Sequence, residues 1–355
     1  MKKLQVGVAL SGGVDSTATA LLLKKHYNVT GFFMQLAQPD LQRQIERVRD
    51  VAGKLDIPLR IMDLAEDFEK RVLNYFRSRY RRGLTPNPCV VCNTEIKFGL
   101  LLDGVIEAGM EKMATGHYVR LKKSGRDFQL HKGVDPAKDQ SYFLARLGQS
   151  QLAGLLFPLG EHRKKDIYDY VEEHGFNSFR GGESQDVCFL QGVSVGKYLQ
   201  KHSACTPGAI VTVDGTVLGR HSGIGNYTVG QRRGLGISAD RPLYVVAIDA
   251  HRNEVVVGGN DELYRHTLLL DDLHWLAGRP PSGNQTFQVK IRSTHSGGEA
   301  ELQPAENGRM RLHFKEAQRA AAPGQFGVIY RGDEVLGAGE IVGKPHEGNI
   351  ARKIA

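Results

Sequence analysis

Two groups of residues have types and spacings suited to chemistry, and the first is a loop near the start of the chain, Ser11-Gly12-Gly13-Val14-Asp15-Ser16. Paired glycines let backbone N–H groups approach an anion, and the start of a helix adds the positive end of its dipole. Ser11 and Ser16 add hydroxyl donors, and Asp15 is suited to hold Mg²⁺ or to cap the helix. No lysine follows the loop, so it differs from the GxxxxGK[ST] phosphate loop. The sequence therefore predicts a phosphate site, the alternative being a tight strand-to-helix turn.

The cysteines form the second group, and three of the four lie in contexts typical of reactive thiols. Cys89 and Cys92 form a Cys-x-x-Cys pair shortly before a helix expected to start near residue 96, and Cys188 follows 188 − 92 = 96 positions after Cys92. A helix N-terminus and nearby cations lower the pKa of a thiol and favour the nucleophilic thiolate. A zinc half-site and a thioredoxin-like redox pair are the alternatives, although zinc needs a second pair and the redox pair a βαβ context. Cys205 is expected to be an ordinary buried residue.

Strands and helices are expected to alternate over the first ~190 residues, as buried apolar runs and amphipathic segments do. The expected strands are 4–10, 29–36, 58–64 and 111–119, and the expected helices lie near 16–25, 40–55, 70–82 and 96–109. This alternation predicts an α/β fold with a parallel, doubly wound sheet. Such sheets bind ligands beyond the carboxyl ends of their strands, so the loops after Leu10, Met34 and Thr115 are expected to carry chemistry.

The second half of the chain differs in composition, because glycine and β-branched residues become frequent after about residue 205. Asp214-Gly215 is a strong hairpin signal, and a second turn falls around residues 251–253. We expect a catalytic domain over residues 1–200, a small antiparallel β domain over 205–267 and a C-terminal β-barrel over 268–355.

Length and charge are those of a globular protein, with 355 residues and 47 Lys+Arg against 39 Asp+Glu. No apolar run approaches the ~18 residues that a membrane span needs, and the first residues lack a signal-peptide cleavage site. We therefore expect a cytoplasmic protein with no membrane partner. Residues 70–82 hold six Lys and Arg and no acidic residue. Six uncompensated cations predict a polyanionic partner such as nucleic acid, the alternative being a solvated helix face.

The motifs also carry a family resemblance. SGGVDS resembles the phosphate loop of the ATP-pyrophosphatase (PP-loop) superfamily. Together with the motifs that follow it in order, it resembles bacterial tRNA-specific 2-thiouridylases of the MnmA type from end to end. These motifs are NPCVVCNTEIKF at 87–98, GHY at 116–118, KDQSYFL at 138–144, SQDVCF at 184–189, YTVGQRRGLGI at 227–237 and PGQ at 323–325.

The resemblance implies an enzyme, a tRNA-uridine 2-sulfurtransferase that converts ATP to AMP and pyrophosphate. ATP would adenylate the C2 oxygen of the wobble uridine, because that oxygen is otherwise a poor leaving group. Cys188 would receive sulfur as a persulfide from a sulfur-carrier or cysteine desulfurase protein. Cys92 would then attack this persulfide to liberate hydrosulfide, or act as partner in a transient disulfide with Cys188.

Binding residues are implied by the same resemblance. ATP and Mg²⁺, the latter held by Asp15, would bind at Ala9, Leu10, Ser11, Gly12, Gly13, Val14, Asp15, Ser16, Met34 and Gly116. The tRNA would contact Asn87, Pro88, Cys89, His117, Lys138, Asp139, Gln140, Arg292 and Gln325. At Arg292 the chain departs from the family, since IRSTH lacks the tyrosine that relatives often carry beside the arginine.

Position 89 is a second departure, because many relatives have an aspartate with an acid–base role there and Cys89 supplies no carboxylate. Cys89, Cys92 and Cys188 would suit a 4Fe–4S cluster with one open iron that binds hydrosulfide, as an alternative to the persulfide relay. A PP-loop enzyme that adenylates a small molecule is a further alternative, which the basic segment and the β domains disfavour. The intact loop and the three thiols disfavour a non-catalytic tRNA-binding protein.

Overall fold

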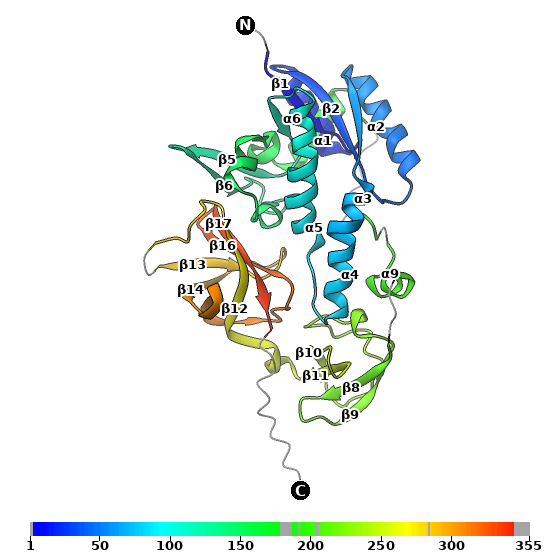
Figure 1. Cartoon of the computed structure of the whole chain (residues 1–355), viewed down its shortest axis with the longest axis vertical. Coiled ribbons are helices and arrows are strands. Elements are labelled where there is room, and N and C mark those ends of the chain that lie inside the picture. The colour runs from blue at the N-terminus through cyan, green and yellow to red at the C-terminus, as the bar shows by residue number, and fades with distance from the viewer. Residues whose placement is uncertain (1–2, 178–186, 191, 203–205, 283–284, 344–355) are drawn as a thin grey trace.

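The computed structural model of the chain describes residues 3–177, 187–190, 192–202, 206–282 and 285–343 (Figure 1). The elements of the first half are β1 (Gln5–Ala9), α1 (Val14–Lys24), β2 (Asn28–Gln35), α2 (Leu41–Leu55), β3 (Leu59–Asp63), α3 (Ala65–Phe68), η1 (Glu69–Leu73), α4 (Asn74–Arg81), α5 (Pro88–Val91), η2 (Cys92–Leu101), α6 (Leu102–Glu107), β4 (Lys112–Ala114), β5 (Val119–Ser124), β6 (Asp127–Lys132), η3 (Ser141–Leu144), α7 (Gln149–Ala153), β7 (Leu155–Leu156), η4 (Pro158–Glu161), α8 (Lys164–Glu173) and α9 (Val195–His202). Those of the second half are β8 (Gly208–Thr212), β9 (Val217–His221), η5 (Ile224–Asn226), β10 (Tyr244–Asp249), β11 (Glu254–Gly258), η6 (Asn260–Leu263), β12 (Tyr264–Trp275), β13 (Thr286–Lys290), β14 (Gly298–Pro304), η7 (Glu306–Gly308), β15 (Met310–Arg319), β16 (Phe326–Arg331) and β17 (Glu334–Val342). No helix in these ranges is long and apolar enough to cross a membrane.

A five-stranded parallel sheet of order β3-β2-β1-β4-β7 forms the first unit. Val6 and Val8 of the central strand β1 are fully buried, as a strand covered by helices on both faces requires. The chain runs from β1 outward to β3 and then returns to β4 on the other side of β1. The loops after β1 and β4 therefore meet at the switch point where doubly wound sheets bind ligands. The predicted α/β fold is confirmed.

The second half is dominated by antiparallel pairs, as predicted. β8 and β9 form the hairpin around Asp214-Gly215, and β10 and β11 pair across the second turn. β8 and β11 pair in parallel to complete a four-stranded sheet. The six strands β12-β15-β14-β13-β16-β17 close into a barrel because β12 also pairs with β17. The predicted barrel is confirmed, and the β5–β6 hairpin extends its sheet by pairing β6 with β17.

Two local predictions of secondary structure were wrong. The strand expected over 111–119 is only three residues long, because the chain leaves the sheet after Ala114 and starts the β5–β6 hairpin at Val119. The helix expected near residue 96 starts at Pro88. Proline suits a first helical position, where no N–H is needed, and Asn87 Oδ1 accepts from the Val90 N–H at 3.3 Å to cap the helix.

The basic segment 70–82 is neutralised more than its sequence indicates. Its cations pair with acids of the same helix and of distant elements: Lys70 with Glu66, Arg71 with Asp67 (3.4 Å) and Glu95 (3.9 Å), Arg77 with Glu69, and Arg79 with Glu340 (2.7 Å). Arg82, at the end of α4, is exposed. The prediction of six uncompensated cations was therefore wrong, because three acidic partners directly precede the segment at 66, 67 and 69 and Glu340 lies 261 positions from Arg79.

The C-terminal end of α4 is a junction between all three parts of the molecule. In Figure 1 this helix runs from the α/β unit toward the β8–β11 sheet. A Cβ at Gly83, which follows it with φ +70°, would lie 2.8 Å from Ile248 Cγ2 of β10. The Thr85 N–H donates to the Pro323 carbonyl of the barrel at 2.7 Å. The helix thus connects the parts rather than presenting a free basic surface.

We expect Arg79→Ala to lower the free energy of unfolding by about 1–3 kcal/mol near pH 8, because Glu340 would lose its cation. Glu340 is 5% exposed, and burial raises its pKa while Arg79 opposes that rise. A raised folded-state pKa means that the carboxyl favours the folded state when protonated, so the loss should shrink as the pH falls toward that pKa. Urea unfolding at pH 8 and pH 5 measures this. Arg126→Ala, in the exposed turn between β5 and β6, is the control, expected within about 0.5 kcal/mol of the wild type; equal losses in both variants would contradict the assignment.

Candidate active site

The loop between β1 and α1 is folded by its own serines and glycines. The Ser11 N–H donates to Ser16 Oγ at 3.1 Å, and the Ser16 hydroxyl donates to the Gly13 carbonyl at 3.0 Å. Gly12 has φ +73°, and a Cβ there would lie 3.2 Å from Arg47 Cγ of α2. Gly13 is the N-cap of α1 and provides no capping side chain. Because the first N–H groups of a helix have no partner within it, this loop offers donors to an anion.

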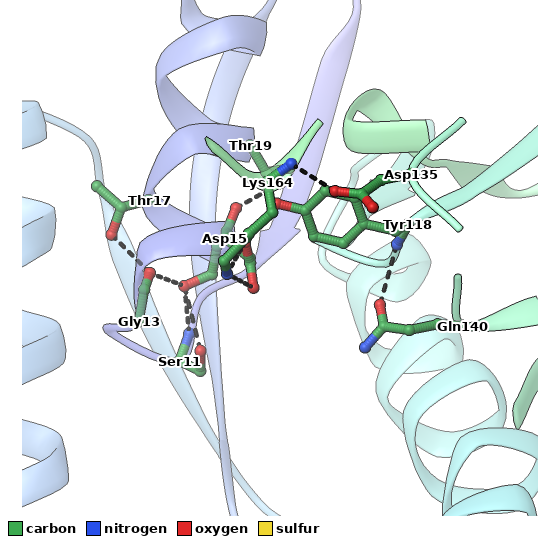
Figure 2. A network of polar contacts seen from close by, with 10 residues as sticks. Ser11, Gly13, Asp15, Thr17, Thr19, Tyr118, Asp135, Gln140 and Lys164 are labelled. Atoms are coloured by element: carbon green, nitrogen blue, oxygen red, sulfur yellow. Dashed lines mark hydrogen bonds and ion pairs between the residues drawn. The ribbon is translucent and has the colours of Figure 1, made fainter. Parts of the chain in front are cut away.

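Asp15, in the first turn of α1, is the centre of a polar network (Figure 2). Lys164 Nζ, from the first residue of α8, lies 2.7 and 2.8 Å from its two carboxylate oxygens. The Tyr118 hydroxyl donates to Asp15 Oδ1 at 2.8 Å. The backbone N–H of Lys164 in turn donates to Asp135 Oδ2 at 3.0 Å. Segments far apart in sequence therefore converge on the phosphate loop.

The loop after β4 connects the phosphate loop to the cysteines. A Cβ at Gly116 would lie 2.8 Å from Asp15 Cβ, so only glycine permits this close approach. The next side chain, His117, has its ring 5.5 Å from the Phe98 ring of η2, the segment that begins with Cys92. One short loop thus contacts both the phosphate loop and the helix that carries the thiols.

His117 is held neutral in this position. Burial lowers its pKa well below the usual value, and the positive charge of Lys97 lowers it further. Its Nδ1 lies 2.8 Å from Thr115 Oγ1. The imidazole is therefore an uncharged hydrogen-bonding group that packs against the rings of Phe98 and Phe157.

The other residues proposed for ATP lie at the same edge of the sheet. Ala9 ends β1, and the N–H of the buried Leu10 donates to the Phe32 carbonyl of β2 at 2.8 Å. Met34 is half-buried near the end of β2. The carboxyl ends of β1, β2 and β4 thus bring these residues together with Gly116, as a site beyond the strand ends requires.

Cys89 and Cys92 are half-buried on the α5–η2 helix, and Cys188 is exposed. Burial raises the pKa of Cys89 to about 11 and that of Cys92 to about 12, and Cys188 contributes to both increases. The prediction that the helix N-terminus lowers these pKa values was wrong, because removal from water outweighs it. The three thiols lie within electrostatic range of one another, and Cys205 lies outside the described residues.

Lys97 is the cation common to the three thiols, although its spacing in the sequence does not indicate this role. Its charge opposes the rise in the pKa of Cys89, Cys92 and Cys188. η2 is a π-helix, in which hydrogen bonds join residue i to residue i+5, so Cys92 and Lys97 lie about one turn apart. An α-helical interpretation of NTEIKF places them on different faces, which is why the spacing gave no signal.

We expect Cys89 and Cys92 to resist alkylation at neutral pH, because a raised pKa leaves almost no thiolate. The rate of iodoacetamide modification should keep rising with pH up to about 11 for Cys89 and about 12 for Cys92. Peptide mass spectrometry after timed alkylation, with protein unfolded in urea as the control, measures the rate at each cysteine. A plateau near pH 8 in the folded protein would contradict the burial effect.

The thiols do not form the ligand set that the cluster alternative needs. Within the part of the chain that the structure describes, no group of three or more His, Cys, Asp or Glu side chains is placed to hold a metal ion. The 4Fe–4S alternative is therefore not supported. Asp15 does fit Mg²⁺ as a single ligand, because its carboxylate is 35% exposed beside the phosphate loop.

Comparison with known proteins decides the family. Three family profiles match consecutive parts of the chain: "tRNA methyl transferase HUP domain" over 4–192, "tRNA methyl transferase PRC-barrel domain" over 196–259 and "Aminomethyltransferase beta-barrel domain" over 265–341. The protein from Desulfotalea psychrophila named tRNA-specific 2-thiouridylase MnmA is 52% identical, covering 96% of this chain and 100% of that protein. This chain belongs to the MnmA family. Its counterparts of the same name from Syntrophomonas wolfei and Herpetosiphon aurantiacus are 43% and 38% identical, each covering 95% of this chain and 100% and 98% of their own.

Several residues that the MnmA resemblance assigns to tRNA make internal contacts in the α/β unit. Gln140 Oε1 accepts from the Tyr118 N–H at 2.9 Å, which ties it to the Asp15 network. The Asp139 side chain is 4% exposed, accepts from the Ser141 hydroxyl at 2.9 Å and lies 3.6 Å from Lys290 Nζ of the barrel. Two other assigned residues are Pro88, which is buried at the start of α5, and Lys138, which is half-buried.

The barrel contributes two more assigned residues. The Gln325 side-chain amide donates to the Thr85 carbonyl at 3.0 Å and to the Pro86 carbonyl at 3.4 Å, directly before the helix that carries Cys89. Arg292 donates to the Arg319 carbonyl at 3.2 Å within the barrel. In this MnmA family member, Gln325 therefore links the barrel to the cysteine-bearing segment, and its contact with tRNA stays a prediction.

Proposed function

We propose that this MnmA-family enzyme replaces the C2 oxygen of the wobble uridine of tRNA with sulfur, using ATP. The observation that carries the proposal is the loop after β4, which contacts Asp15 through Gly116 and the Cys92 helix through His117. Activation of an oxygen and delivery of sulfur must act on the same carbon. A phosphate loop and thiols on either side of one short loop support that sequence of steps.

Activation comes first in this scheme. The uridine C2 oxygen attacks the α-phosphorus of ATP, an O–P bond forms, and the bond to pyrophosphate breaks. The backbone donors of the loop around Gly13 would bind the departing pyrophosphate. Asp15 would hold Mg²⁺, which supplies charge neutralisation on the phosphates when bound. The neutral imidazole of His117 would lie near the base as a hydrogen-bonding group.

Sulfur delivery follows. The small fraction of Cys92 that is ionised attacks Sγ of a Cys188 persulfide, which forms a Cys92–Cys188 disulfide and releases hydrosulfide. Hydrosulfide attacks C2, and AMP leaves with the former C2 oxygen. An external dithiol then reduces the disulfide to the two cysteine thiols, supplies two electrons and two protons, and is itself oxidised to a disulfide. Lys97 would favour the Cys92 thiolate and the hydrosulfide anion by its charge.

We further propose that a sulfur-carrier or cysteine desulfurase protein loads Cys188. Cys188 is exposed, whereas Cys89 and Cys92 are half-buried, so a protein donor has the readiest access to Cys188. Because tRNA is a substrate of the scheme, we place the reaction in the cytoplasm.

The test uses protein purified without oxygen, incubated with ATP, Mg²⁺, unmodified tRNA and either sulfide or a desulfurase with cysteine. Mass spectrometry of digested tRNA should show oxygen-to-sulfur exchange in uridine, dependent on ATP. ATP–pyrophosphate exchange should require tRNA; exchange without tRNA would favour the small-molecule alternative. Thiolation that rises and falls with bound iron would overturn the persulfide relay, and no thiolation with either donor would overturn the function.

A further inference from the structure

The glycine-rich stretch 227–237, YTVGQRRGLGI, has no role in the reaction scheme, yet the structure holds it in a defined conformation between η5 and β10. Gln231 orders its start, because its Oε1 accepts from the Thr228 N–H at 3.1 Å and its Nε2 donates to the Arg233 carbonyl at 3.0 Å. Farther along, Leu235 is 6% exposed and belongs to the hydrophobic core of the β8–β11 sheet. The stretch is therefore anchored at its start and in its middle.

A pocket of about 250 Å³ lies within this part of the chain and is lined by residues between positions 232 and 243. Its lining includes Arg232 and Arg241, which are both exposed. Gly234 and Gly236 also line it, with φ values of +77° and +69°. At these glycines no side chain covers the backbone N–H groups. Two arginines beside bare backbone are suited to bind an anion.

The hydrogen-bond donors around this pocket are not used within the protein. In the part of the chain that the structure describes, no backbone N–H of residues 232–241 donates to a protein acceptor. The guanidinium groups of Arg232 and Arg241 likewise make no ion pair or hydrogen bond with a described residue. Asp240 is the one acidic residue between positions 228 and 243, against three arginines. These donors therefore face solvent, and an anion is the ligand that they favour.

The segment that carries the pocket begins beside the chain that leads to the thiols. The Thr85 hydroxyl donates to Thr228 Oγ1 at 3.4 Å, and Thr85 precedes Cys89 by four positions. In Figure 1 the β8–β11 sheet lies beyond the end of α4, where this junction forms. A polymer that places one unit near Cys89 can therefore reach the pocket with another unit.

We propose that the pocket at 232–243 binds a phosphate group of the tRNA backbone, with Arg232 and Arg241 as its charged donors. Arginine and backbone N–H groups are the usual phosphate donors in such interfaces, and these contacts fix the position of the nucleic acid without reading its sequence. The β8–β11 sheet thus holds the tRNA while the uridine reacts elsewhere. This inference rests on the proposed use of tRNA as substrate.

The experiment measures the binding of an unmodified tRNA transcript to the full chain at several salt concentrations, by filter binding. The variants are Arg232→Met, Arg241→Met and the double variant, all at exposed positions. Arg252→Met is the matched control, because this arginine of the same sheet is 68% exposed and already lies 3.8 Å from Asp249. All single variants lose one positive charge, so the control accounts for the change in net charge.

We expect each pocket variant to weaken tRNA binding about 10-fold at low salt, the effect of losing one charged hydrogen bond. The slope of the logarithm of the binding constant against the logarithm of the salt concentration should become shallower by about 1 for each arginine, and by about 2 for the double variant. The loss should be equal for transcripts of different sequence. Arg252→Met should change neither the affinity nor the slope.

Each other outcome overturns a distinct statement. Unchanged affinity and slope in the double variant, with normal wild-type binding, overturn the phosphate site and leave the proposed function intact. An equal loss in Arg252→Met shows that only the general charge of the sheet acts, which also overturns the site. A loss of affinity without a change in slope overturns the assignment to phosphate. Wild-type protein that binds no tRNA overturns the proposed function itself.

A second measurement distinguishes the tRNA backbone from free phosphate compounds. Equilibrium dialysis with ATP and with inorganic phosphate should give the same affinities for the double variant and the wild type, because the pocket is assigned to RNA alone. In the thiolation assay the double variant should raise the KM for tRNA about 10-fold or more and leave kcat within about twofold. Loss of ATP or phosphate binding in the double variant would assign the pocket to a small anion and overturn the inference.

Discussion

Cys92→Ser is expected to abolish thiolated uridine, by about 1,000-fold or more, while pyrophosphate is still released. Serine is close to cysteine in size, but its hydroxyl is a much weaker acid and nucleophile than a thiol and does not attack a persulfide. The phosphate loop lies across the β4 loop from η2, so activation of the uridine oxygen should proceed within about threefold of the wild type. Mass spectrometry of tRNA digests and a pyrophosphate assay measure the two steps on the same samples.

Two further serine variants sharpen this result. Cys188→Ser should show the same separation, because the relay needs a site for the persulfide. Cys205→Ser changes the one cysteine without a reactive sequence context and should thiolate normally. If pyrophosphate release disappears together with thiolation in Cys92→Ser, Cys92 acts in activation; if thiolation persists, the relay is excluded.

Asp15→Asn is expected to lower ATP–pyrophosphate exchange about 100-fold or more, while tRNA affinity stays within about twofold. The amide is close in shape to the carboxylate and still accepts the Tyr118 hydrogen bond, but it lacks the charge that Mg²⁺ requires. Asp166→Asn, an exposed aspartate of α8, is the control. An equal loss of tRNA affinity, measured by filter binding, would contradict the assignment of Asp15 to ATP chemistry.

The α/β half was predictable because its strands are buried on both faces. Val6 and Val8 belong to one continuous apolar run, which a two-sided parallel strand requires and which needs no knowledge of its partners. The length of β4 was overestimated because the apolar residues up to Val119 belong to strands of two different sheets. Pairings such as β8 with β11 and β6 with β17 join distant segments whose local patterns contain no information on register.

The candidate site shows the same difference between local motifs, which the sequence predicts, and contacts from distant segments, which it does not. The loop at Asp15 is a local motif, whereas its partner Lys164 comes from a distant helix and was missed. A signal did exist, because Lys164, Ile167 and Val171 share the i, i+3, i+7 spacing of a buried helix face, and a lysine on such a face needs an anion. The thiol pKa values were predicted in the wrong direction because burial of Cys89 and Cys92 is a tertiary effect.

The pairing of β6 with β17 also determines which strand edge a truncated protein would expose. Leu130 pairs with Val335 and His131 pairs with Glu334, so the last strand that the structure describes covers an edge of the β5–β6 hairpin. A fragment that ends before β12 would expose this edge together with the fully buried Leu130. Uncovered strand edges recruit strands from other chains, and self-association follows. Truncation of the barrel is therefore expected to appear as insolubility of the α/β half before any loss of catalysis can be measured.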